Sequence, residues 1–315
     1  MGFTSVAPTV LAELFPTPAR ITGVSLVYNR VFMTCGGFAP SDLRGLMSGA
    51  NEPTFWRDDA LPFMEARFVE DGRKVCYARH AHETLSIGAV SSGQCHYLNG
   101  KKAERIGAGT VVVMNPGDVH ACNPIGDEPW RYRMLYIDAD WLGAMEAGSG
   151  GRSRSGFVPF SATATRRAEL YAGLNRLFEI LIDPRVEFLR KQSAAVMLLG
   201  AVREALGTGL TYVTPPSLAR AAEFIRENCT RSLRLQEICT EVGLSASYLI
   251  RSFKEVYGLT PHAYQVNCRI EFCRSRLRQG WPIAEVALAA GFSDQAHLQR
   301  IFKRVVAATP GQYRA

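Results

Sequence analysis

The last hundred residues of this 315-residue chain contain one short pattern twice. Residues 237–239 read Glu-Ile-Cys and recur at 285–287 as Glu-Val-Ala, while 242–245 read Val-Gly-Leu-Ser and recur at 290–293 as Ala-Gly-Phe-Ser. Beyond this point the second copy gains one residue, and the match then continues through a Thr-Pro pair near the end of each copy. An internal repeat of this kind predicts two copies of one supersecondary unit.

Each copy has the pattern of a helix-turn-helix. The first predicted helix buries small apolar side chains, and Gly243 or Gly291 supplies the left-handed position that ends it and turns the chain. Ser245 or Ser293 is expected to cap the second helix, which buries apolar residues about one turn apart and directs polar ones outward. The residues predicted to bind DNA are Ser247, Tyr248, Ile250, Arg251, Lys254, Gln295, His297, Gln299, Arg300 and Lys303.

The chemistry and charge of this region favour a nucleic-acid partner. Arg and Gln can each form two hydrogen bonds with a base edge in the major groove, whereas Lys and Ser suit phosphate oxygens. From Ser217 to Ala315 the chain has 14 Lys and Arg against 8 Asp and Glu, while the remainder has 22 against 21. We therefore predict double-stranded DNA as the partner. An arginine-rich helical bundle that does not contact DNA is the alternative.

A long helix is predicted to begin at Thr260 and Pro261 and to hold the two units at a fixed separation. With Gly-Phe-Ser-Asp-Gln at 291–295 and Thr-Pro-Gly-Gln-Tyr-Arg at 309–314, residues 217–315 resemble the DNA-binding domain of the AraC/XylS family of transcription regulators. The resemblance implies a sequence-specific regulator, an activator that contacts RNA polymerase. The chain departs from the family at Ala307, where glycine is usual and where alanine in a left-handed cap costs about 1 kcal/mol. We expect the last turn to be looser or closed differently.

Residues 54–210 carry a different pattern. Short strands are predicted at 74–77, 85–90, 110–114 and 132–137, with a hairpin turn at 98–101, and their spacing indicates a small antiparallel barrel or sandwich. Two helices follow, the first with the apolar stripe Leu170, Leu174, Leu177 and Leu181 and the second from about 186 to 206.

The predicted fold class is α+β with two domains, namely a β-barrel followed by helices and an all-α tandem helix-turn-helix domain. The predicted divisions are an unassigned arm at 1–53, an effector-binding and dimerisation domain at 54–210, a linker at 211–216 around paired prolines, and the DNA-binding domain at 217–315. The apolar stripe of helices 166–206 predicts a homodimer, or else a helix packed on its own barrel.

Three histidines mark a candidate effector site. His80 and His82 lie on one face of a predicted strand, and His120 follows the Pro116-Gly117 turn. This pattern resembles the cupin barrel that many regulators of the family use as a sensor. The resemblance implies a small-molecule effector bound by His80, His82 and His120. Metal-binding cupins add a glutamate a few residues after the second histidine, but Glu83 follows it directly and would face the other way, so no metal is predicted. A metal held by these three histidines, or a structural role for them, stays open.

The remaining composition narrows the function classes. No stretch approaches the roughly 18 apolar residues of a membrane helix, and the first residues lack a secretory-signal pattern. The eight cysteines are scattered, which favours reduced side chains in a cytoplasmic protein. We predict no catalytic residues and no cofactor, because no nucleophile elbow or phosphate-binding loop is found. The competing functions are a cupin metalloenzyme with an appended nucleic-acid-binding module, and a constitutive DNA-binding protein.

Overall fold

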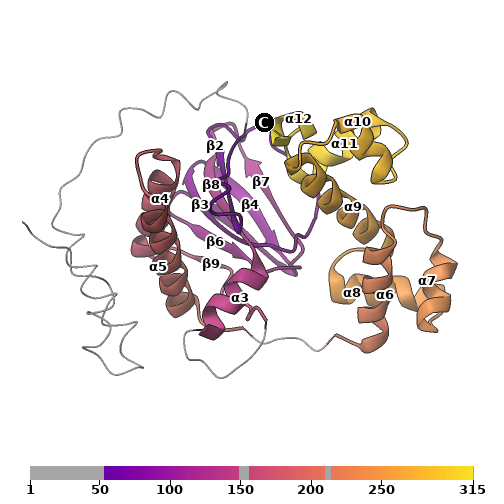
Figure 1. The fold of residues 1–315 in the computed structure, drawn as a ribbon. Helices are drawn as coiled ribbons and strands as arrows, with labels where there is room; N and C mark the ends of the chain where they lie inside the picture. Colours follow the sequence, from indigo (N-terminus) through magenta and orange to yellow (C-terminus); the bar gives the residue numbers. More distant parts are fainter. Residues whose placement is uncertain (1–52, 149–155, 210–213, 315) are drawn as a thin grey trace, which may run out of the picture.

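The computed structural model describes residues 53–148, 156–209 and 214–314 (Figure 1). The predicted arm at 1–53 therefore lies outside the described residues except for its last position, and so do residues 211–213 of the predicted linker. Among the described residues, no helix is long and apolar enough to span a lipid bilayer.

The N-terminal part consists of two antiparallel sheets. The larger sheet has the order β1-β2-β8-β3-β6-β9, and the smaller has the order β5-β4-β7. The strands are β1 (Thr54–Trp56), β2 (Met64–Val69), β3 (Leu85–Ser92), β4 (Gln94–Asn99), β5 (Lys102–Gly107), β6 (Val111–Met114), β7 (His120–Ile125), β8 (Arg131–Ile137) and β9 (Ala164–Thr165). The predicted antiparallel β-domain is thus confirmed, although its described strands form two facing sheets rather than one closed barrel.

Residues of the large sheet alternate between two cores. Ile87 and Ala89 of β3 join the core beneath the helices α4 (Ala168–Ile182) and α5 (Phe188–Leu206), while Val90 faces the smaller sheet. Figure 1 shows these two helices on one side of the sheet and the small sheet on the other. The short helix α3 (Ala139–Gly148) follows β8. The apolar stripe predicted at 170–181 is buried in this core, so it packs on the chain's own sheet.

Most predicted strands are found, but one is wrong. The predictions at 85–90, 110–114 and 132–137 correspond to β3, β6 and β8, and a two-residue turn at Gly100 joins β4 to β5. Residues 74–77 form a turn and irregular chain instead. There the Asn123 side chain takes the place of a neighbouring strand, because it accepts from Tyr77 N (2.6 Å) and donates to Tyr77 O (3.1 Å).

The C-terminal part is entirely helical, as predicted. Its helices are α6 (Pro216–Glu227), α7 (Leu235–Val242), α8 (Ala246–Tyr257), α9 (Pro261–Arg278), α10 (Ile283–Ala289), α11 (Gln295–Val306) and α12 (Pro310–Arg314). The first helix-turn-helix unit is α7 and α8, and the second is α10 and α11. Pro216 occupies the first turn of α6, a position that needs no backbone N–H donor.

The turns follow the prediction except at one cap. Gly243 and Gly291 both have positive φ, and Ser245 caps α8 by accepting from Tyr248 N. The predicted cap at Ser293 is wrong, because Asp294 accepts from His297 N instead. The extra residue of the second copy moves the start of the helix by one position, which brings the aspartate to the cap.

Candidate nucleic-acid interface and effector site

The second helix of each unit presents a polar surface. Leu249 and Phe253 of α8 are fully buried, as are Leu298 and Phe302 of α11. Nine of the ten predicted DNA-binding side chains are exposed on the opposite faces of these helices. The tenth, His297, is half-buried, with its ring against Phe292 and its Nδ1 3.1 Å from the Ser293 hydroxyl. Its position fits a role in shaping the turn.

The helix between the units connects them through Arg269. Its guanidinium donates to the carbonyls of Cys229 (2.7 Å) and Arg231 (2.9 Å), in the loop before α7. The same group donates to Gly291 O (2.9 Å), in the turn of the second unit. One α9 side chain therefore joins both units, and no motif in the sequence predicts this link.

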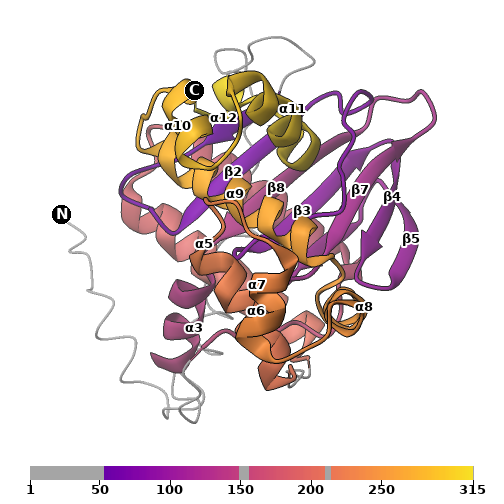
Figure 2. The same ribbon diagram turned by 90° about the vertical axis from the view of Figure 1, so that its right-hand side faces the viewer.

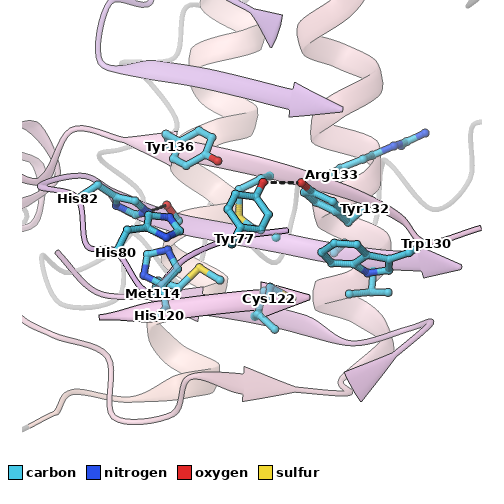
Figure 3. A pocket seen from close by; sticks show the side chains of 16 residues that line it. Tyr77, His80, His82, Met114, His120, Cys122, Trp130, Tyr132, Arg133 and Tyr136 are labelled. Atoms are coloured by element: carbon cyan, nitrogen blue, oxygen red, sulfur yellow. Dashed lines mark hydrogen bonds between the residues drawn. The ribbon is translucent and has the colours of Figure 1, made fainter. Parts of the chain in front are cut away.

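The histidine cluster lies between the two sheets of the N-terminal part (Figure 3). The ring centroids of His80 and His120 are 4.4 Å apart, and those of His82 and His120 are 4.7 Å apart. The predicted proximity is found, but the predicted strand is not, since His80 forms an isolated bridge with His120 before β3 begins. The cavity beside them measures about 30 Å³, and its wall includes Tyr77, Trp130 and Tyr132.

Backbone carbonyls orient all three imidazoles. Nδ1 of His80 lies 2.8 Å from Ala78 O, and Nδ1 of His120 lies 2.8 Å from Asp118 O. Nδ1 of His82 lies 2.9 Å from the carbonyl oxygen two residues further on. A carbonyl only accepts hydrogen bonds, so each Nδ1 carries the proton and each Nε2 carries a lone pair.

Burial keeps these rings uncharged. It lowers the pKa of His120 to about 4. Burial and the neighbouring His120 hold the pKa values of His80 and His82 well below the ordinary value. The cluster therefore presents neutral nitrogen acceptors to the cavity at neutral pH.

Two other contacts, one between residues of the cavity wall and one directly behind it, were not predicted. The hydroxyls of Tyr77 and Tyr132 are 2.6 Å apart, and burial holds the pKa of Tyr77 well above its ordinary range and raises that of Tyr132 to about 12. The thiols of Cys95 and Cys122 lie 2.8 Å apart across β4 and β7. The scattered positions of these residues in the sequence give no sign of either pair.

The segment carrying His80 and His82 also contacts the helix-turn-helix domain. Ala78 N donates to Arg304 O of α11 (2.9 Å). The Asn267 side chain on α9 accepts from Ala81 N (3.1 Å) and donates to Ala81 O (2.7 Å). Figure 2 shows α9 lying across the large sheet. The segment 78–82, which carries two of the clustered histidines, thus also contacts the DNA-binding domain.

A buried arginine of β2 forms a second connection. Arg67 is 1% exposed and donates to Val306 O (2.6 Å) and Ala307 O (3.1 Å), at the end of α11. Among the described residues, Ala307 is the non-glycine residue with positive φ. Its N–H still donates to Lys303 O (2.9 Å), which ends the helix. The last turn is therefore closed in the ordinary way, and the arginine satisfies carbonyls that a helix end leaves free.

Glu65, also on β2, contacts side chains of α9 and α12 in the DNA-binding domain. It accepts from the Tyr313 hydroxyl (3.0 Å) and pairs with Arg274 (3.5 Å) and Arg57 (2.8 Å). Burial acts to raise the pKa of Glu65, but Arg274 and Arg57 outweigh it and hold the pKa below its ordinary value. The sensor sheet and the DNA-binding domain are thus joined by buried ionic groups.

An N-terminal β-domain with a cavity and a C-terminal double helix-turn-helix define a DNA-binding transcription regulator. Comparisons with known proteins agree with this class. The model of the AraC-like ligand binding domain matches residues 64–199, and that of a helix-turn-helix domain matches residues 238–315. The chain is 32% identical to the HTH-type transcriptional regulator YbfI of Bacillus subtilis over 227 residues, which cover 70% of this chain and 81% of YbfI. The chain therefore belongs to the AraC family of transcription regulators.

Other relatives agree with this assignment. The MmsAB operon regulatory protein of Pseudomonas aeruginosa is 24% identical over 245 residues, covering 75% of this chain and 76% of that protein. A crystal structure of apo ToxT from Vibrio cholerae has a TM-score of 0.51 at 14% identity, covering 84% of this chain and 98% of ToxT. The ToxT likeness shows the shared two-domain fold. The protein is a DNA-binding regulator with an N-terminal ligand-binding domain.

Proposed function

We propose that α8 and α11 read the bases of one DNA site, and that the cavity of the histidine cluster receives the effector that controls this binding. The observation that carries the proposal is the placement of exposed Arg, Gln and Lys side chains on the second helix of both units. In α8 these are Arg251 and Lys254, and in α11 they include Gln295, Gln299, Arg300 and Lys303. Arg and Gln are placed to read base edges, and Lys to contact phosphates.

A mobility-shift series at increasing salt tests the DNA part of the proposal. Binding of the full chain to a duplex enriched from a randomised pool should fall steeply with salt, because basic side chains displace counterions from phosphates. Lys254→Ala should weaken binding similarly on all sequences. Lys74→Ala, an exposed lysine of the N-terminal part, is the matched control and should leave binding unchanged. Salt-independent binding, or no binding, would contradict the proposal.

The effector site rests on the cavity and on its connection to the second domain. ToxT, which shares this fold at 13% identity and a TM-score of 0.50, has been crystallised with an unsaturated fatty acid. We infer that His80, His82 and His120 contact the small effector in this chain. A ligand that binds the folded state raises its melting temperature, so a thermal-shift screen of metabolites identifies candidates. Normal effector responses in His80→Ala, His82→Ala and His120→Ala would favour a structural role for the cluster.

We further propose a homodimer through α5. Its outer face exposes Phe188 (45%), Leu189 (65%), Val196 (37%) and Met197 (39%), whereas the stripe on α4 is buried. Leu189, Val196 and Met197 are seven and eight positions apart, so they lie on one face of the helix and match the spacing of a two-helix seam. Leu189→Glu with Met197→Glu should convert a dimer to a monomer in sedimentation velocity. A wild-type monomer at micromolar concentration would contradict this interface.

The finer assignments complete the proposal. We propose a sensor domain at 54–210 and a DNA-binding domain at 217–315, with activation through RNA polymerase, a cytoplasmic location and no enzymatic activity. Transcription in a reconstituted system that responds to no small molecule would favour the constitutive alternative. Turnover of a ligand by the purified protein would favour the enzyme.

A further inference from the structure

The histidine cluster has the geometry of a transition-metal site. One ligand atom from each of His80, His82 and His120 lies within 4.8 Å of the other two. Each Nδ1 is bonded to a backbone carbonyl, which leaves the lone pair on Nε2. A hydrogen bond from the second ring nitrogen is the usual support of a metal-bound imidazole, because it fixes the tautomer and the ring orientation.

The size of the cavity favours an ion over an organic molecule. At about 30 Å³ it has room for about two water molecules. Pockets for organic effectors are about 300 to 1,000 Å³, so such a ligand would need the walls to move. An ion with one further ligand fits the cavity as it stands.

The nitrogen atoms are available to such an ion. Nε2 of His80 and of His120 has no hydrogen-bond partner among the described residues. Nε2 of His82 lies 3.1 Å from the Ser86 hydroxyl, which can rotate away. Of the nearby cations, Arg274 is paired with two carboxylates. Arg67 has no carboxylate partner among the described residues, because it bonds to the carbonyls of Val306 and Ala307 and to the Tyr136 side chain. The unpaired charge of Arg67 favours an anion as the fourth metal ligand.

We propose that His80, His82 and His120 bind a divalent transition-metal ion such as Zn²⁺ through Nε2, and that residues 78–82 transmit its binding to the helix-turn-helix domain. The transmission rests on the proposed effector control. Nitrogen ligands of a tetrahedral zinc lie about 3.4 Å from one another, given bonds of about 2.0 to 2.1 Å. Metal binding therefore draws the three rings together and moves Ala81 against Asn267 of α9.

Cobalt spectroscopy on the chelator-treated full chain tests the site. We expect one Co²⁺ per chain with the visible bands of a tetrahedral nitrogen site, displaced by Zn²⁺. His82→Gln and His120→Gln should abolish these bands while circular dichroism confirms that both variants are folded. His96→Gln, an exposed histidine of β4, is the matched control and should retain them. Absent bands, or bands that persist in both folded cluster variants, would overturn the site.

Linkage with DNA tests the transmission. Zn²⁺ should change the affinity for a duplex enriched from a randomised pool about 5-fold or more, and the duplex should change Zn²⁺ affinity by the same factor. Asn267→Ala should keep the cobalt bands but bring this factor close to one. Metal binding without any change in DNA affinity would overturn the transmission. DNA binding without metal binding would overturn the metal site and leave the proposed function standing. Metal binding without DNA binding would leave the metal site standing and overturn the proposed DNA binding.

Discussion

The two helix-turn-helix units share one architecture but are attached to the sensor domain differently. The first unit meets it through apolar contact, with Leu259 packed on Val119 and Ala81. The second is attached by hydrogen bonds to carbonyls of its own recognition helix, from Arg67 and from the backbone of Ala78. Hydrogen bonds are directional, whereas apolar contacts tolerate sliding. A change in the sensor should therefore move the second unit more than the first.

The largest expected effect is a difference in stability between alanine substitutions in the turns of the two units. Gly291 has a φ of 78°, and a Cβ there would overlap the Thr230 carbonyl oxygen, whereas a Cβ at Gly243 would have no neighbour within 4 Å. Gly291→Ala should cost about 4 kcal/mol of unfolding free energy, and Gly243→Ala about 1 kcal/mol. Urea unfolding measures both. Equal costs would show that the turns are equally crowded.

The next effect concerns the attachment of the second unit. Arg67→Leu removes two buried charge-assisted hydrogen bonds and should cost about 3 kcal/mol. The matched change on the sensor side of the first unit's contact, Val119→Ala, removes only apolar contact and should cost about 1 kcal/mol. Hydrogen exchange should show faster opening of α11 in the first variant, with α8 unchanged. Equal opening of both helices would contradict the difference in attachment.

The smallest effect is expected when the residues that end the two recognition helices are exchanged, with glycine placed at 307 and alanine at 258. Ala307 has a φ of 53° and Gly258 a φ of 69°, so both are left-handed. Ala307→Gly should stabilise the protein by about 1 kcal/mol, because glycine adopts this conformation without strain. Gly258→Ala should destabilise it by about 1 kcal/mol or slightly more, since the added Cβ would lie 3.0 Å from Val119. A destabilising Ala307→Gly would show that the alanine methyl group contributes packing that outweighs its strain.

The sequence predicted what depends on local rules. The helix-turn-helix units followed from glycines at left-handed positions and from helical spacing, and β3, β6 and β8 followed from their apolar runs. The nearness of the three histidines followed from motif resemblance. The failure at Ser293 came from a one-residue insertion that leaves two polar side chains competing for the same cap.

Long-range polar contacts were beyond such rules. Strand β2 was missed because Glu65 and Arg67 interrupt its apolar pattern, although both are buried. Their partners include Arg274 and Val306, more than 200 positions away, so only the folded chain shows why charged residues occupy a sheet interior. The attachment of the second unit, and its link to the effector site, could not be predicted for the same reason.

The central claim is that the two units read separate parts of one DNA site. Binding selection on randomised DNA, with the wild-type full chain, Arg251→Ala and Arg300→Ala, tests it most directly. Each variant should lose about 1 to 3 kcal/mol of binding free energy. The two variants should lose base preference in different parts of the DNA site, and these parts should lie about one helical turn apart. Loss of preference at the same base positions in both variants, or unchanged preference in either, would contradict the account.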